Sequence, residues 1–211
     1  LVMGSFFVGP LAKAGVVPPT SHLLYDKLDL LGPLLAPDAN GIRLPAGFVS
    51  RLVAQSGQRV LPTANYIWHS APDGGATFAT DDGGWIYVSN SEISKYGGGA
   101  GALRFNPRGD VIGAYSILNG TNSNCAGGKT PWNTWLSCEE EPDGQVYECD
   151  PFGERAGIVR PALGRFKHEA VAVDPAQGQL YLTEDVPDGG FYRFTPEHGL
   201  PDLTSGTLEI A

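Results

Sequence analysis

The chain repeats one pattern of strands three times, and this repetition limits the folds that it can adopt. In each repeat an apolar strand ends in polar or acidic residues, a turn follows, and a second strand closes on proline. Matching Tyr87, Trp135 and Tyr181 aligns the repeats with offsets of 48 and 46 residues. A self-similar period of this length is typical of an array of equivalent sheets.

Each repeat contains four short expected strands, and its two central strands form a hairpin. Pro-Asp-Gly turns at 142–144 and 187–189 have the backbone freedom that tight hairpins require. The expected strands are 76–80, 85–92, 102–107 and 111–118, then a less clear strand near 130 with 134–140, 146–151 and 158–159, then 170–173, 180–185, 191–196 and 207–211.

Four strands per unit of about 45 residues predict an all-β β-propeller. The blades are expected at 64–119, 120–164 and 165–211, and a sandwich or meander with coincidental spacing is the alternative. Known propellers close with four to eight blades, so three blades are expected to be part of a larger ring. The preceding segment, 21–63, is expected to be an extension in which 48–54 is a candidate ring-closing strand.

The first 20 residues resemble the end of an export signal. Residues 1–11 are apolar or small, and Ala12-Lys13-Ala14 follows with small residues at the spacing of a signal-peptide cleavage site. An ordinary buried N-terminal segment is the alternative. The apolar run is too short to span a bilayer, so we expect an exported protein without a stable membrane span.

Charge and composition exclude two classes of protein. The 14 basic and 23 acidic residues give a net charge of −9, which cannot neutralise a phosphate backbone, so nucleic acid is not an expected partner. Only 18% of the residues are charged and 10% are aromatic, which favours a packed core over intrinsic disorder.

The sequence contains three cysteines. A two-residue loop in the 138–149 hairpin would place Cys138 opposite Cys149, where either a disulfide or two unlinked thiols is compatible with the sequence. Cys125 is left over in both cases. It lies in a glycine-rich segment rather than in an apolar strand, so it is a candidate for chemistry.

Polar side chains gather where the innermost strands of the blades begin and where the next strands end. The segments 69–75, 122–128 and 167–170 begin the inner strands, and Glu92, 139–141 and 184–185 follow the second strands. Carboxylate and amide oxygens suit Ca²⁺, whereas a thiolate favours a transition metal. The pattern indicates a mixed-metal centre, although any one acid alone is typical of a solvated turn, and His69 and His168 alone are typical of core or surface histidines.

Two familiar catalytic motifs do not apply. The glycine run at 97–101 joins two expected strands instead of opening a helix, so we expect a flexible hairpin loop rather than a phosphate-binding loop. No G-x-S-x-G motif is present to indicate a serine hydrolase.

The segment GTNSNCAGGKTPWNTWLSCEE at 120–140 closely resembles the hallmark of the PhoX-type alkaline phosphatase family. The segments 84–92, 168–170, 182–185 and 191–194 continue the resemblance. It implies a six-bladed propeller, twin-arginine export to the periplasm or medium, and an Fe³⁺ and Ca²⁺ centre that hydrolyses small phosphomonoesters. The family's proteins are longer, and its later ligands and phosphate-binding basic residues have no counterpart here.

The resemblance also implies roles for particular residues. Cys125 would be a thiolate ligand of iron, and Glu140 and Glu169 would be carboxylate ligands shared among the ions, so these three are the expected catalytic residues. Further expected metal ligands are Asn124, Glu184 and Asp185. A noncatalytic calcium-binding propeller is the alternative function, and a calcium-dependent lactonase ranks third.

Overall fold

The computed structural model describes residues 29–211. Within the chain, one unit ends at Val53 and a second runs from Ala54 to Ala211. The expected signal remnant at 1–20 and the start of the extension, 21–28, lie outside the described residues. No helix in the described part of the chain is long and apolar enough to cross a membrane.

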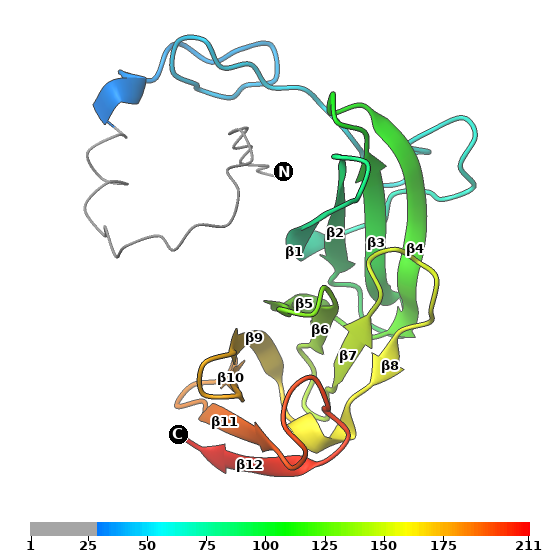
Figure 1. The fold of residues 1–211 in the computed structure, drawn as a ribbon. Coiled ribbons are helices and arrows are strands. Elements are labelled where there is room, and N and C mark those ends of the chain that lie inside the picture. Colours follow the sequence, from blue (N-terminus) through cyan, green and yellow to red (C-terminus); the bar gives the residue numbers. More distant parts are fainter. Residues whose placement is uncertain (1–28) are drawn as a thin grey trace. The chain divides into compact units, whose positions relative to one another are not determined.

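Three four-stranded antiparallel sheets make up the second unit (Figure 1). The first contains β1 (Pro72–Ala79), β2 (Trp85–Ser91), β3 (Gly98–Phe105) and β4 (Val111–Thr121). The second contains β5 (Asn124–Lys129), β6 (Trp135–Glu139), β7 (Val146–Cys149) and β8 (Ile158–Val159). The third contains β9 (His168–Asp174), β10 (Gln179–Glu184), β11 (Phe191–Pro196) and β12 (Gly206–Ile210). The predicted all-β class and the four strands of each repeat are confirmed.

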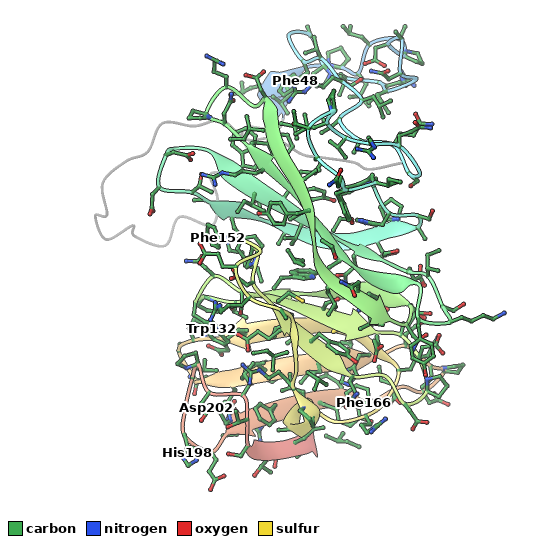
Figure 2. The ribbon with its side chains drawn as sticks, turned by 90° about the vertical axis from the view of Figure 1, so that its right-hand side faces the viewer. Phe48, Trp132, Phe152, Phe166, His198 and Asp202 are labelled. Atoms are coloured by element: carbon green, nitrogen blue, oxygen red, sulfur yellow. The ribbon has the colours of Figure 1, made fainter. Side chains whose placement is uncertain are left out.

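The sheets stack in chain order (Figure 2), and their innermost strands lie side by side, with β5 between β1 and β9. Apolar side chains fill the space between successive sheets. Between the first two sheets lie Phe78, Ile86, Val88, Ile117, Trp135 and Cys149. Between the second and third lie Leu136, Cys138, Val146, Leu180, Leu182 and Phe194. The middle sheet is therefore buried on both faces, which explains why every residue of β6 is buried.

Glycines allow the inner strands to approach one another. A Cβ atom on Gly128 of β5 would lie 1.9 Å from the carbonyl oxygen of Val171 on β9. On the other side of β5, a Cβ atom on Gly74 of β1 would lie 2.7 Å from the Cα atom of Ala126. Neither contact can accommodate a side chain, so the close spacing of the three inner strands depends on these glycines.

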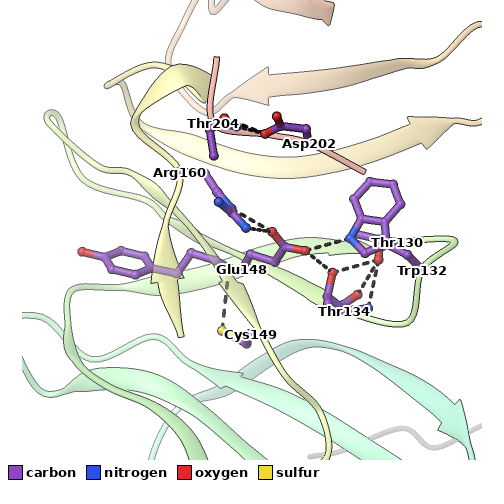
Figure 3. A network of polar contacts seen from close by, with 9 residues as sticks. Thr130, Trp132, Thr134, Glu148, Cys149, Arg160, Asp202 and Thr204 are labelled. Carbon is purple, nitrogen blue, oxygen red and sulfur yellow. Dashed lines mark hydrogen bonds and ion pairs between the residues drawn. The ribbon is translucent and has the colours of Figure 1, made fainter. Parts of the chain in front are cut away.

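A buried carboxylate ties together the outer part of the second sheet (Figure 3). Glu148 on β7 is 8% exposed, and its Oε1 atom accepts hydrogen bonds of 2.7 Å from the Trp132 indole and the Thr134 hydroxyl. Its Oε2 atom forms an ion pair of 2.6 Å with Arg160. Because both oxygens are paired, the buried charge is compensated and links three segments of the blade.

Two predictions from the sequence about local backbone structure are wrong. Residues 48–54 form no strand, so the strand expected there is not present in this structure. The glycine run is not a loop either, because β3 begins at Gly98. A Cβ atom on Gly101 would lie 2.1 Å from the Tyr66 hydroxyl, so glycine there lets Tyr66 pack directly on the strand.

The suggested disulfide does not form, and the alternative of unlinked thiols holds. All three cysteines are free and buried. Cys138 pairs with Val146, and Cys149 pairs with Trp135. The reason is the turn: the Glu139 amide donates to the Gln145 carbonyl, so the loop is longer than two residues and shifts the register.

The third repeat is also aligned differently from the sequence match. Val171 on β9 pairs with Leu182, as Gly127 on β5 pairs with Ser137. Leu182 and Ser137 are therefore equivalent, and the residues two positions before them are Leu180 and Trp135. Leu180 rather than Tyr181 is thus the equivalent of Trp135. Leu180 is fully buried, and a slip of one residue in a strand exchanges the two faces, so the sheet places the smaller apolar side chain in the core.

We expect Gly128→Ala to destabilise the fold by about 2–3 kcal/mol, because its methyl group would overlap the backbone of β9. Gly113→Ala is the matched control: its Cβ would lie 3.4 Å from the Arg104 Cβ, an ordinary contact. Urea unfolding of both variants measures the difference. Equal unfolding midpoints would contradict the claim that close strand approach requires Gly128.

Candidate metal centre

The inner strand of each sheet contains a β-bulge at the same position. In the first sheet the register shifts between Pro72 and Gly75, and in the second between Asn124 and Gly127. In the third it shifts between His168 and Val171, which pair with Glu184 and Leu182. In each case two residues of the inner strand face one residue of its neighbour. The first residue of each bulge is Asp73, Cys125 or Glu169, and bulges of this kind redirect side chains near active sites.

A second set of equivalent acids follows the neighbouring strands. Glu92, Glu140 and Asp185 come directly after β2, β6 and β10. The backbone amide of each donates to the carbonyl of the residue that precedes the inner strand, at 2.9, 2.9 and 3.0 Å. Each sheet therefore presents one bulge side chain and one strand-end acid at the same end of its two innermost strands.

Cys125 lies at the centre of this arrangement. Its Sγ atom is 3.6 Å from Asp73 Oδ1 and 3.5 Å from Glu169 Oε2, and its side chain is buried. β5 runs between β1 and β9, so the thiol of the middle sheet reaches the carboxylates of both neighbours.

The donor atoms form two groups, and each group follows the repeat. Asp73, Glu92 and Cys125 make up the first group, and Cys125, Glu140 and Glu169 make up the second. The atoms of each group lie within 4.8 Å of one another. Each group combines the bulge and strand-end residues of one sheet with the bulge residue of the next, and Cys125 belongs to both. Carboxylates with one shared thiol are a donor set suited to metal ions.

The mutual proximity of these groups disfavours their ionisation in the protein by itself. Burial raises the pKa of the Cys125 thiol, and the neighbouring Glu140 and Glu169 raise it further. Burial, together with Glu140 and Asp73, raises the pKa of both Glu92 and Glu169. A cation bound among them would favour the ionised forms, so the electrostatics of the cluster fit a metal site.

Asn90 fixes the backbone that carries Cys125. This buried amide donates to the carbonyls of Cys125 and Ala126 at 3.0 and 2.8 Å. Its oxygen accepts from the Trp135 indole at 2.9 Å and from the Ser137 hydroxyl at 2.8 Å. All four hydrogen-bonding positions of the amide are used, so Asn90 of the first sheet holds the bulge of the second in place.

The structure brings Cys125, Glu140 and Glu169 together, and Asp185 lies beside them through Lys167, whose Nζ atom is 3.4 Å from Asp185 Oδ2. The other two expected ligands, Asn124 and Glu184, bond to other groups instead. The buried Asn124 amide pairs with Thr121 and Ser137, at 2.5 and 2.9 Å. Glu184 accepts bonds of 3.0 Å from the Gly190 amide and the Tyr192 hydroxyl, within its own hairpin.

Both histidines considered in the sequence pack against other side chains. His69 bonds to the Tyr66 hydroxyl at 2.9 Å, and its other ring nitrogen lies 3.2 Å from Ser89 Oγ. His168 is fully buried and packs against Phe166, with the ring centroids 3.7 Å apart and the ring planes tilted by 33°. Burial lowers the pKa of each to about 4, so both rings are neutral at pH 7.

Sequence reasoning did not select Asp73 as a ligand, and it noted Glu92 only as a strand-end acid. Both can be identified by their positions in the repeat. Asp73 occupies the bulge position of Cys125 and Glu169, and Glu92 occupies the strand-end position of Glu140. This equivalence depends on bulges, which change the spacing of inner and second strands and are not visible in the sequence.

The fold and the cluster together define a β-propeller-like protein with a candidate metal-binding centre. A family model described as alkaline phosphatase PhoX matches residues 73–157 and 141–209. The chain belongs to this PhoX alkaline phosphatase family, as its resemblance at 120–140 predicted.

One solved structure supports the fold. Pseudomonas fluorescens PhoX, in complex with the transition-state analogue vanadate, matches with a TM-score of 0.59 and 19% sequence identity. The match covers 74% of this chain and 49% of the PhoX chain, so the present chain spans about half of that protein. A comparison with curated proteins found no match.

We expect Asn90→Ala to destabilise the protein by about 3–5 kcal/mol, because it leaves buried partners on β5 and β6 without hydrogen bonds. Asn119→Ala, at an exposed position of β4, is the control and should change stability by less than about 0.5 kcal/mol. Chemical denaturation measures both. A wild-type unfolding midpoint for Asn90→Ala would show that the amide does not organise the bulge.

We expect Glu169→Gln to stabilise the metal-free protein at pH 7 and to have little effect at pH 4. The pKa of Glu169 is raised in the folded state, so its ionisation destabilises the fold as pH rises above the unfolded value. Glutamine removes this effect, whereas at pH 4 the wild-type side chain is already largely protonated. Unfolding midpoints in EDTA across this range test the prediction, and a stabilisation confined to low pH would contradict it.

Proposed function

We propose that this chain contributes to a metal-dependent hydrolase of small phosphomonoesters, with Fe³⁺ and Ca²⁺ as its cofactors. The observation that carries the proposal is the double role of Cys125, whose thiol belongs to both donor groups. Membership of the alkaline phosphatase family supports the reaction class. The vanadate bound to Pseudomonas fluorescens PhoX, a relative in fold, is consistent with phosphoryl chemistry.

The donor chemistry favours a mixed centre over a calcium site alone. Ca²⁺ is bound by oxygen ligands, and a thiolate contributes little to its binding. Softer transition metals do use thiolates. A noncatalytic calcium-binding propeller would not require Cys125 between Asp73 and Glu169, so it is the weaker of the two proposals.

The residues of this chain would act by binding and orientation. Cys125, Glu140 and Glu169 would hold one cation, and Asp73 and Glu92 with Cys125 would hold another. Metal ions at such a site supply Lewis acidity to phosphoryl oxygens and favour an oxygen nucleophile. Three of the donors lie in bulges of the inner strands and the other two directly follow strands, so binding requires little rearrangement of the backbone.

Removal of the thiol tests this proposal. Cys125→Ser should lower the iron content of the purified protein and reduce hydrolysis of a generic phosphomonoester by about 100-fold, because a hydroxyl is a poor substitute for a thiolate ligand. Glu169→Gln should do the same. Elemental analysis and a chromogenic phosphatase assay measure the two effects.

Cys138→Ala is the matched control, because its thiol faces the core between the second and third sheets. It should retain the metals and the activity. Wild-type protein that contains calcium but no transition metal would favour the noncatalytic alternative. Iron content that is unchanged in Cys125→Ser would show that the thiol is not a ligand.

A further inference from the structure

The third repeat differs from the other two at one position beside the cluster. One residue precedes each inner strand, and its carbonyl oxygen accepts a hydrogen bond from the backbone amide of a strand-end acid. These residues are Ala71, Ser123 and Lys167. Ala71 and Ser123 have φ angles of 44° and 43°. The third repeat therefore places a long cationic side chain where the others carry small residues.

The Lys167 side chain reaches back to the second repeat. Its Nζ atom lies 2.7 Å from Glu140 Oε1 and 3.4 Å from Asp185 Oδ2. The Glu140 side chain is 14% exposed and the Lys167 side chain 31%, so the carboxylate end of this ion pair is the better shielded from water. Charge-assisted bonds of this length are among the stronger polar contacts, and this one fixes the orientation of the Glu140 carboxylate.

The contact engages one of the two carboxylate oxygens of Glu140. Because Lys167 bonds to Oε1, a cation bound with Cys125 and Glu169 would compete with the ammonium group for Oε1 but not for Oε2. Ca²⁺ takes six to eight oxygens and often binds both oxygens of one carboxylate. A transition metal bound by a thiolate needs fewer oxygens.

We propose that Lys167 is a positioning residue that makes Glu140 a one-oxygen ligand and so favours a transition metal over Ca²⁺ in the Cys125–Glu140–Glu169 group. This inference rests on the proposed function, because it requires that the group binds a cation. The group formed by Asp73, Glu92 and Cys125 has no lysine at the corresponding position. The residue equivalent to Lys167 there is Ser123, which precedes β5, and its hydroxyl donates to Glu141 Oε1 at 2.7 Å rather than to Glu92.

The test compares the binding of Co²⁺ and Ca²⁺ to the metal-free chain, with the absorption of a Co²⁺–thiolate bond as the spectroscopic readout. Lys167→Ala reproduces the residue of the first repeat, and Lys167→Met retains the aliphatic stem. Both variants should reduce the preference for Co²⁺ over Ca²⁺ by about tenfold or more, since partners of metal ligands typically change affinity by that factor.

Lys129→Met is the matched control. Lys129 lies at the other end of β5, where it donates to the Thr77 carbonyl at 2.8 Å, so the variant removes the same charge without touching the donor groups. It should retain the wild-type preference, which separates positioning from a change in net charge. Circular dichroism checks that each variant is folded.

The outcomes distinguish the two proposals. A wild-type chain that binds neither ion would overturn the proposed metal centre. Wild-type binding with an unchanged Co²⁺ preference in both Lys167 variants would leave the centre standing and overturn the role of Lys167. Weaker binding of both ions by the same factor would also overturn it, because selectivity is the property that a merely structural lysine would not change.

Discussion

The structure around the candidate centre depends on one buried amide. Asn90 belongs to the first sheet, yet all four hydrogen bonds of its side-chain amide reach the second sheet. Two of them hold the carbonyls of the bulge that carries Cys125. A buried polar network is stable only when each member is paired, and here the pairing also fixes where the two sheets meet. The position of the thiol follows from this contact.

The candidate centre illustrates how a repeat can produce different chemistry at equivalent positions. The bulge residue is an aspartate, a cysteine and a glutamate in the three sheets, and the backbone that carries it is the same in each. Only the side chains differ, so the two donor groups share a geometry and differ in charge and softness. Lys167 adds a second difference, because it replaces the small residues of the other repeats.

Much of the fold was predictable from the sequence, since strand patterns and turn signals are local properties. The errors arose where packing from distant segments or the exact length of a turn decides the outcome. The glycine run at 97–101 suggested a loop, but Tyr66 packs on Gly101 from another part of the chain. Cys138 and Cys149 suggested a pair, but a longer turn changed their register. The suggested strand at 48–54 has no partner among the described residues.

The sequence by itself determined the all-β class, the three repeats and the family, because each depends on residues that are close along the chain. It also indicated Cys125, Glu140 and Glu169 through their resemblance to that family. Only the tertiary structure decided that Asp73 and Glu92 join the thiol, that Asn124 and Glu184 are engaged elsewhere, and that Lys167 bonds to Glu140. Most of those relations join different sheets across bulges and side-by-side inner strands, and such contacts have no local signature because packing between sheets creates them.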